Sequence, residues 1–183
     1  MKKALLIIGI VLLLFAMNGV FADSKEIKAT AEIISCTSSE PIGKAILTER
    51  RSDEGVKLVD ITVIADDLSQ GKHGVHIHEV GDCTPCADAG GHFDPGPSGN
   101  SSPDGNHPFH TGDLVNLEVR GNGSGVMHTT TSRITLSAGP LSVFDGNGSA
   151  IVVHVNPDTY CPSGSEAGCA GGARAACGVI VAD

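Results

Sequence analysis

The stretch that decides the fold runs Val56-Lys57-Leu58-Val59-Asp60-Ile61-Thr62-Val63-Ile64-Ala65. Apolar and β-branched residues recur at every second position, with Asp60 and Thr62 on the other face. This alternation is typical of a β-strand that buries one face. Similar runs, separated by Gly, Asp, Asn and Ser, occur at residues 26–35, 42–48, 74–79, 114–120, 125–136, 150–155 and 178–182. Because helical periodicity is nearly absent after the N-terminal segment, the sequence predicts an antiparallel all-β sandwich or barrel.

Two long segments interrupt this pattern. Residues 81–112 are rich in Gly, Pro, Asp and Ser and hold several histidines, whereas residues 156–176 hold Asp158, Arg174 and two cysteines. Long ordered loops in a compact domain usually carry function. We therefore expect the chemistry of the protein to lie in these two loops.

The N-terminal segment is basic and then apolar. Lys2 and Lys3 precede an apolar run at residues 4–15, and the small residue Ala22 precedes Asp23. This order is typical of a secretory signal peptide, so residues 1–22 are predicted to be removed and residues 23–183 to form one domain. An uncleaved anchor is the alternative. No later apolar run reaches membrane-spanning length, so no membrane contact is expected after cleavage.

The composition excludes several classes of partner. The 183 residues include 21 acidic and 12 basic ones, giving a formal net charge of −9, and loss of the two N-terminal lysines makes the chain more acidic. Such a chain is not expected to bind nucleic acid or anionic lipid. With no Trp and 3% aromatic residues, the core must be filled by Val, Ile and Leu.

The cysteines agree with export. All six lie after the predicted signal peptide, at positions 36, 83, 86, 161, 169 and 177. An even number in an oxidising compartment favours structural disulfides, although spacing alone does not choose the pairing. A redox pair or half a zinc site at Cys83 and Cys86 is disfavoured, because neither a βαβ pattern nor a second CxxC accompanies them.

A group of histidines indicates a metal site. His76 and His78 stand two apart, so on a strand both point to the same face. The long loop and a later strand add further ligand types: His92, His107, His110, Asp113 and His154. Clustered imidazoles with one carboxylate suit copper and zinc.

These residues resemble a known family, the secreted copper,zinc superoxide dismutases of the bacterial, periplasmic type. The motifs occur in family order over residues 71–181: Gly71-Lys72-His73-Gly74-Val75-His76-Ile77-His78-Glu79, Gly81-Asp82-Cys83, Ala89-Gly90-Gly91-His92-Phe93-Asp94-Pro95, His110-Thr111-Gly112-Asp113-Leu114, Val152-Val153-His154 and Gly171-Gly172-Ala173-Arg174-Ala175-Ala176-Cys177-Gly178-Val179-Ile180. The resemblance implies a Greek-key antiparallel β-sandwich, or flattened barrel, with two long functional loops.

The resemblance also assigns roles to residues. It implies copper ligation by His76, His78 and His154, with His92 as a bridge to zinc and as a carrier of the catalytic proton. His110 and Asp113 correspond to zinc ligands, Asp158 to a carboxylate that links the two metal sites, and Arg174 to a guanidinium that attracts the anionic substrate. His73 corresponds to a framework histidine that binds no metal.

One position departs from the family pattern. Asn100 stands where the family usually has a third zinc histidine, so the zinc site is either incomplete or uses another ligand. His107, three residues before His110, is our candidate for that ligand, and an exposed loop histidine is the alternative. Some relatives work with copper alone.

The resemblance implies a disulfide from Cys177 to the first long loop. Cys83 is the favoured partner and Cys86 the second choice. Cys161 and Cys169 pair either with each other or with Cys36 and Cys86.

The implied function is dismutation of superoxide to O2 and hydrogen peroxide, an antioxidant activity in the periplasm or outside the cell. A copper-binding or copper-storing module of the same fold is the alternative, although storage needs neither Asp158 nor Arg174. The family forms more than one kind of interface, so the sequence leaves the oligomeric state open, with a homodimer among the choices.

Overall fold

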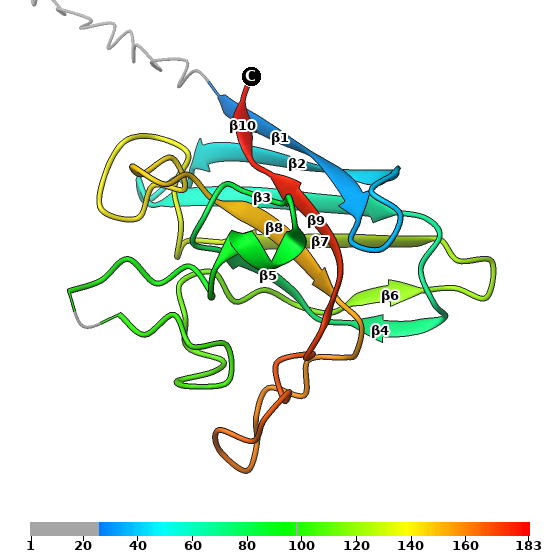
Figure 1. Cartoon of the computed structure of the whole chain (residues 1–183). Helices are drawn as coiled ribbons and strands as arrows, with labels where there is room; N and C mark the ends of the chain where they lie inside the picture. Colours follow the sequence, from blue (N-terminus) through cyan, green and yellow to red (C-terminus); the bar gives the residue numbers. More distant parts are fainter. Residues whose placement is uncertain (1–25, 98) are drawn as a thin grey trace, which may run out of the picture.

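The three longest strands, β1 (Ile27–Ser35), β2 (Pro41–Arg51) and β3 (Lys57–Ala65), form a continuous antiparallel meander. We describe it from a computed structural model that covers residues 26–97 and 99–183 (Figure 1). The predicted signal peptide at residues 1–22 lies outside these residues. The remaining strands are β4 (Gly71–His73), β5 (Val75–His78), β6 (Leu117–Val119), β7 (Gly125–Thr131), β8 (Ala150–His154), β9 (Arg174–Val179) and β10 (Val181–Ala182).

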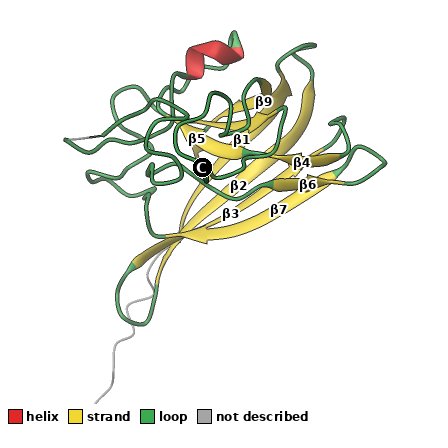
Figure 2. Cartoon of the chain, turned by 90° about the horizontal axis from the view of Figure 1, so that it is seen from below, coloured by secondary structure: helices red, strands yellow, loops and turns green. Residues whose placement is uncertain are grey.

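The strands curl into a flattened, nearly closed barrel. Along the sheet the order is β4-β6-β7-β3-β2-β1-β9-β8-β5, all neighbours are antiparallel, and β10 pairs with β1. The path begins at β4 and ends at β5, which are separated only by Gly74. One chain segment therefore joins both ends of the sheet. The all-β, antiparallel, nearly closed architecture predicted from the sequence is confirmed, with long loops gathered beside the strands (Figure 2).

The core follows the alternation seen in the sequence. On β3, Val59, Ile61 and Val63 are buried, while Asp60 faces outward. The Asp60 carboxylate accepts hydrogen bonds from Arg50 Nε at 2.6 Å and from the Thr130 hydroxyl at 2.6 Å. Each buried aliphatic side chain of this size contributes about 1.5–3 kcal/mol, so burial on the inward face of the barrel is a large favourable contribution to folding.

Two predicted strand boundaries were wrong. Strand β7 ends at Thr131 rather than at residue 136. The backbone N–H groups of Leu136 and Ser137 instead donate to the Glu49 carboxylate, at 2.6 and 2.8 Å, so they take no part in the sheet. Strand β9 begins at Arg174, inside the segment predicted to be loop, because Arg174 pairs with His154 on β8.

Two further elements differ from the sequence-based expectation. Of the predicted strand at residues 114–120, only β6 forms. The first long loop contains a short 3-10 helix, η1 (Cys86–Ala89). Residues 26–97 and 99–183 contain no candidate membrane-spanning helix.

Candidate metal centre

Strand β5 places two histidines on one buried face. Ile77 belongs to the hydrophobic core, so the alternation of the strand directs its neighbours His76 and His78 to the opposite side. The first long loop runs along the free edge of β5 and forms isolated bridges there, His76 with Asp113 and His78 with His92. The loop thus delivers two more polar side chains to the same place.

Four imidazoles converge at this face: His76, His78, His92 and His154. One ligand atom from each lies within 4.8 Å of the others, and all four side chains are buried. One ring nitrogen of each has no hydrogen-bond partner among the described residues: His76 Nδ1, His78 Nε2, His92 Nε2 and His154 Nε2. Buried polar atoms are rarely left unpaired, so this cluster fits a bound copper ion.

The other nitrogen of each of these rings is anchored. His76 Nε2 lies 3.0 Å from Asp158 Oδ2, and His92 Nδ1 lies 2.7 Å from Asp113 Oδ1. His78 Nδ1 and His154 Nδ1 face backbone carbonyl oxygens, those of Gly90 at 3.0 Å and Gly172 at 2.8 Å. The contacts of His76, His78 and His154 fix ring orientation as outer contacts do at metal sites, which aims the unpaired nitrogens at one another, whereas His92 Nδ1 and Asp113 belong to a second cluster.

A second cluster surrounds the carboxylate of Asp113. His92 Nδ1, His107 Nδ1 and His110 Nδ1 lie 2.7, 3.1 and 3.0 Å from its oxygens. Around a tetrahedral zinc ion with ligand bonds near 2.0 Å, neighbouring ligand atoms are about 3.3 Å apart. These spacings between imidazole nitrogens and the carboxylate fit a zinc site. The group whose ligand atoms all lie within 4.8 Å of one another consists of His76, His92, His107 and Asp113, and His110 joins it through Asp113. His92 takes part in both clusters.

Asp158 lies between the two clusters. Besides His76, its carboxylate contacts His107 Nε2, at 2.9 Å from Oδ1 and 2.8 Å from Oδ2. His107 is buried, whereas Asn100 is exposed and its side-chain oxygen accepts a hydrogen bond from Ser102 N at 3.0 Å. The structure brings His107, and not Asn100, to the second cluster.

His73 is buried outside both clusters. Its two ring nitrogens lie 2.7 Å from the carbonyl oxygen of His154 and 2.8 Å from that of Ser69. Both nitrogens are occupied by backbone groups, which fits a structural role.

The electrostatics of the two clusters differ. Desolvation is the main cause that lowers the pKa of His78 well below its ordinary value, that of His92 to about 4 and that of His154 to about 3. Desolvation also acts against charge on His107, but its contacts with Asp113 and Asp158 outweigh it and raise its pKa to about 9. His78, His92 and His154 thus offer neutral nitrogens, whose free electron pairs are what a metal ion binds.

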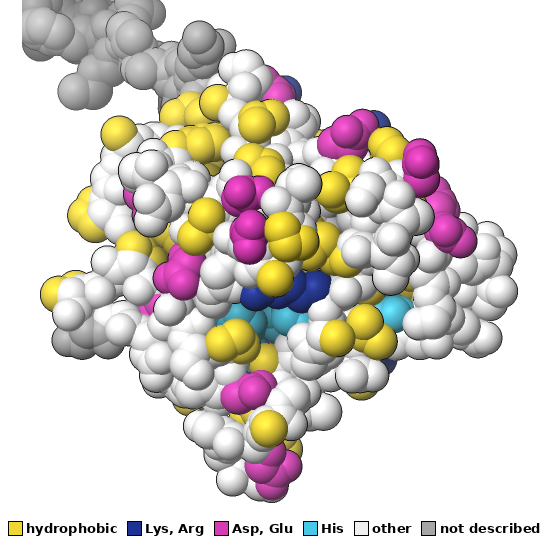
Figure 3. Space-filling model, in the orientation of Figure 1, with side chains coloured by type: hydrophobic (Ala, Val, Ile, Leu, Met, Phe, Trp, Pro, Cys, Tyr) yellow, Lys and Arg dark blue, Asp and Glu magenta, His cyan; other side chains and the backbone are white. Residues whose placement is uncertain are grey.

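Arg174 stands at the entrance to the first cluster. It is half-buried, and its guanidinium donates hydrogen bonds to the carbonyl oxygens of Cys86 and Gly90. Its positive charge helps to lower the pKa of His78 and His154, although burial is the larger cause. Figure 3 shows histidine and basic side chains at the floor of a hollow in this face, with acidic groups further out.

Within the described residues the six cysteines form three disulfides, Cys36–Cys86, Cys83–Cys177 and Cys161–Cys169. Of the partners that the sequence left open for Cys177, the structure bonds Cys83. Two of the bridges hold the first long loop against β9 and the end of β1, and so support the segment that carries Gly90 and His92.

Three residues near the clusters had no signal in the sequence. Arg133 donates to the carbonyl oxygens of His110, at 3.0 Å, and Asp113, and so fixes the backbone of two candidate ligands. Asn116 Oδ1 accepts a hydrogen bond from Asp158 N at 2.8 Å, and Asp104 binds the second long loop. Each acts across at least 20 residues, which spacing along the chain does not reveal.

Comparisons with known proteins agree with this geometry. Residues 41–180 match the family model described as copper/zinc superoxide dismutase (SODC). A protein from Legionella pneumophila named superoxide dismutase [Cu-Zn] is 33% identical, and the alignment covers 98% of each chain.

Solved structures resemble the fold. An SOD-like protein from Bacillus subtilis superposes with a TM-score of 0.64 at 26% identity, over 83% of this chain and 97% of its own. A double mutant of that protein, with one Tyr and one Pro replaced by His, gives a TM-score of 0.65 at 30% identity, over 82% and 95%. The chain therefore belongs to the copper/zinc superoxide dismutase family.

Proposed function

We propose that this chain is a superoxide dismutase, which converts two superoxide anions and two protons into one O2 and one hydrogen peroxide. The observation that carries the proposal is the convergence of four buried imidazole nitrogens without hydrogen-bond partners among the described residues. Family membership supports the same activity.

The proposed copper ligands are His76, His78, His92 and His154. Bound copper would supply a centre that alternates between Cu(II) and Cu(I), which zinc does not do. The protein supplies neutral, fixed nitrogens, because burial keeps the pKa of His92 and His154 below the physiological range. Rings held by outer hydrogen bonds need little rearrangement between the two oxidation states.

The proposed zinc ligands are His92, His107, His110 and Asp113. A structural zinc site usually has four protein ligands, and these four complete the set without Asn100. The contact of His107 with Asp158 supports this assignment, since metal-bound histidines commonly pair their second nitrogen with a carboxylate.

Arg174 is the residue that we assign to substrate capture. The substrate is a small anion, while the whole chain has a formal net charge of −9. A local positive charge in a hollow raises the concentration of an anion there, and the guanidinium provides it beside the proposed copper ligands.

His92 is the residue that we assign to proton handling. Its Nε2 has no hydrogen-bond partner among the described residues, and its Nδ1 faces Asp113. Nε2 is therefore the atom that would take up a proton when it is not bound to the metal, and that would then pass this proton to the reduced substrate.

We also propose that the protein acts in the periplasm or outside the cell, with residues 1–22 removed as a signal peptide. Three disulfides support this location, because such bonds persist in oxidising compartments.

Superoxide decay after a radiolytic pulse, measured with copper-loaded protein of known metal content, tests the proposal. We expect a decay rate proportional to bound copper. Stoichiometric copper without accelerated decay would favour the storage module instead.

A further inference from the structure

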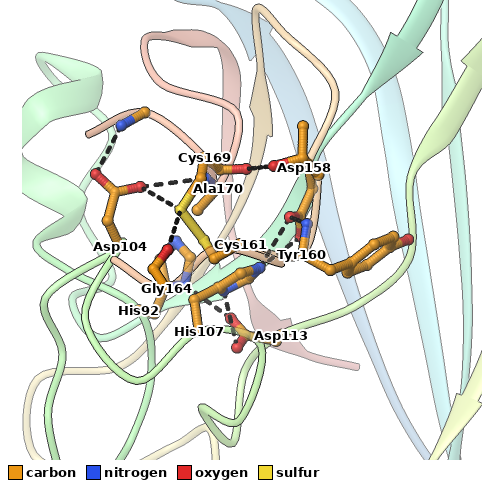
Figure 4. Close-up of a disulfide and its surroundings, with 12 residues drawn as sticks. His92, Asp104, His107, Asp113, Asp158, Tyr160, Cys161, Gly164, Cys169 and Ala170 are labelled. Carbon is orange, nitrogen blue, oxygen red and sulfur yellow. Dashed lines mark hydrogen bonds and ion pairs between the residues drawn. A yellow bond between two sulfur atoms is a disulfide. The ribbon is translucent and has the colours of Figure 1, made fainter. Parts of the chain in front are cut away.

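The two long loops meet at a point outside the metal clusters. There, Asp104 of the first loop faces the disulfide Cys161–Cys169 of the second (Figure 4). Its carboxylate accepts hydrogen bonds from Gly168 N at 2.8 Å and from Ala170 N at 3.1 Å. Cys169 Sγ lies 3.6 Å from the same carboxylate but carries no proton in a disulfide, so the two amides are the donors.

The amides that Asp104 holds belong to a short, closed ribbon. Ala170 forms an isolated bridge with Asp158, and Thr159 N donates to Cys169 O at 2.9 Å. The disulfide between Cys161 and Cys169 closes this ribbon after eight residues. A displacement of Ala170 would therefore also displace the backbone of Asp158, to which it is paired.

The ribbon returns to the first loop through His107. The Asp158 carboxylate contacts His107 Nε2 at 2.8 Å, and His107 is three residues from Asp104 in the chain. Asp104, Ala170, Asp158 and His107 thus form a closed ring in which two separate contacts join the loops. Figure 4 shows Asp104 and His107 reaching the same ribbon from one side.

We propose that Asp104 is a positioning residue for the zinc site, acting through His107 and Asp158. This inference rests on the proposed function, in which His107 is a zinc ligand. His107 lies in a stretch without regular structure: residues 99–107 form turns and bends but no helix or strand. Its backbone needs an anchor close by, and the charge-assisted bonds of Asp104 to two amides supply one.

This anchor is needed because the proposed zinc ligand is His107 and not residue 100, where the family usually has a histidine. The start of the stretch is held by Asp94, whose carboxylate accepts a hydrogen bond from Asn100 N at 2.9 Å. His107 follows Asn100 by seven positions in the chain. On the other side the chain is held at His110, whose carbonyl oxygen accepts a hydrogen bond from Arg133. Without the contacts of Asp104, the stretch between Asn100 and His110 would lose its bonds to the backbone of the second loop, and zinc binding would cost more ordering entropy.

The experiment compares zinc affinity, by competition with a chelator, in wild-type protein, Asp104→Ala and Asp104→Asn. We expect Asp104→Ala to weaken zinc about tenfold to a hundredfold, the range found for outer contacts at metal sites. Asp104→Asn keeps one acceptor oxygen, so it should weaken zinc binding less than Asp104→Ala does. Asp145→Ala is the matched control, since the exposed carboxylate of Asp145 accepts, among the described residues, only from Asn147 N in a turn of another loop.

A double-mutant cycle separates positioning from general loop stability. In a His107→Ala background, Asp104→Ala should weaken zinc no further, whereas independent effects would multiply. The visible spectrum of Co²⁺ bound in place of zinc should also change in Asp104→Ala but not in Asp145→Ala.

Equal zinc affinity in wild type and Asp104→Ala would overturn this inference and leave the proposed zinc site standing. A full additional loss in the His107→Ala background would overturn it as well. Wild-type protein that binds no zinc would overturn both the inference and the zinc assignment. None of these measurements requires superoxide turnover, so a failure of the dismutase proposal is recognised separately.

Discussion

His107 and Asp158 join the two long loops through a buried contact of 2.8 Å between Nε2 and Oδ2. The same carboxylate oxygen lies 3.0 Å from His76 Nε2. Asp158 Oδ2 thus orients one histidine of each cluster. A shift of the first loop at His107 would therefore alter the contact that orients His76. Asn100 has no such link, because its exposed side chain closes a local turn with Ser102.

Zinc binding should depend on His107 and not on Asn100. We expect His107→Ala to weaken zinc at least tenfold, while Asn100→Ala changes it little. Asn100→His should not tighten zinc, because position 100 faces solvent in this loop. Zinc titration of copper-loaded protein measures all three, and tight zinc binding by His107→Ala would refute the assignment.

The charge of Arg174 should control how fast superoxide arrives. We expect Arg174→Ile to lower the rate about tenfold or more and to flatten its dependence on ionic strength, with copper content unchanged. Arg120→Ala removes the same charge from an exposed site beyond β6 and serves as the control. An unaltered salt profile in Arg174→Ile would show that this guanidinium does not steer the substrate.

Gly112 should be irreplaceable because it packs directly against β5. A Cβ there would collide with Ile77 O and lie 3.0 Å from Phe93 Cβ. We expect Gly112→Ala to cost about 1–3 kcal/mol of unfolding free energy and to weaken both metals, since Ile77 stands between His76 and His78. In Gly146→Ala no described atom lies within 4 Å of the new Cβ, so the unfolding free energy and the metal affinities should stay unchanged. Denaturant unfolding and metal analysis make the comparison, and equal behaviour of the two variants would contradict it.

Glu49 should make the barrel sensitive to acid. Desolvation raises the pKa of Glu49, but its hydrogen bonds with Ser137 and Leu136 together lower it below the ordinary value. A lowered folded-state pKa means that this contribution is complete above the unfolded pKa of about 4.3 and is lost as pH falls through the folded pKa.

We therefore expect Glu49→Gln to lower the unfolding free energy by about 1.5–3 kcal/mol at pH 7 and by progressively less below about pH 4. Urea unfolding of both proteins at each pH gives the difference, and exposed Glu118→Gln is the control. A difference that does not shrink in acid would mean that the charge of Glu49 is not the cause.

The sequence predicted those parts of the fold in which burial repeats at short range. Residues 57–65 alternate in the structure as they do in the sequence, because each inward side chain meets the core. The start of β9 was missed since Arg174 and Ala175 follow a glycine pair and have no alternation of their own. Arg174 joins the strand by pairing with His154 on β8, 20 residues away along the chain, and the carbonyl oxygen of Ala175 accepts a hydrogen bond from Cys36 N.

Some residues of the candidate site could likewise be predicted from the sequence, and others could not. His76 and His78 stand out from spacing alone, and a resemblance to a family placed most of the others. Between Asn100 and His107 the sequence could not decide, because a Gly- and Pro-rich loop has many paths of equal length. The choice depends on Asp158, 51 residues beyond His107, and on Asp104, whose partners lie in the other loop.

The central claim is that four converging imidazoles make this chain a dismutase, and the superoxide rate per bound copper tests it most directly. The measurement compares wild-type protein with His154→Ala, which removes one of the four nitrogens, and with His128→Ala, which removes an exposed histidine bonded to Thr62 on the sheet. We predict fast catalytic decay for wild type and His128→Ala, and decay reduced at least a hundredfold for His154→Ala at saturating copper, a typical scale for loss of an essential group. Equal rates per copper in wild type and His154→Ala, or no catalysis by fully loaded wild-type protein, would contradict the account.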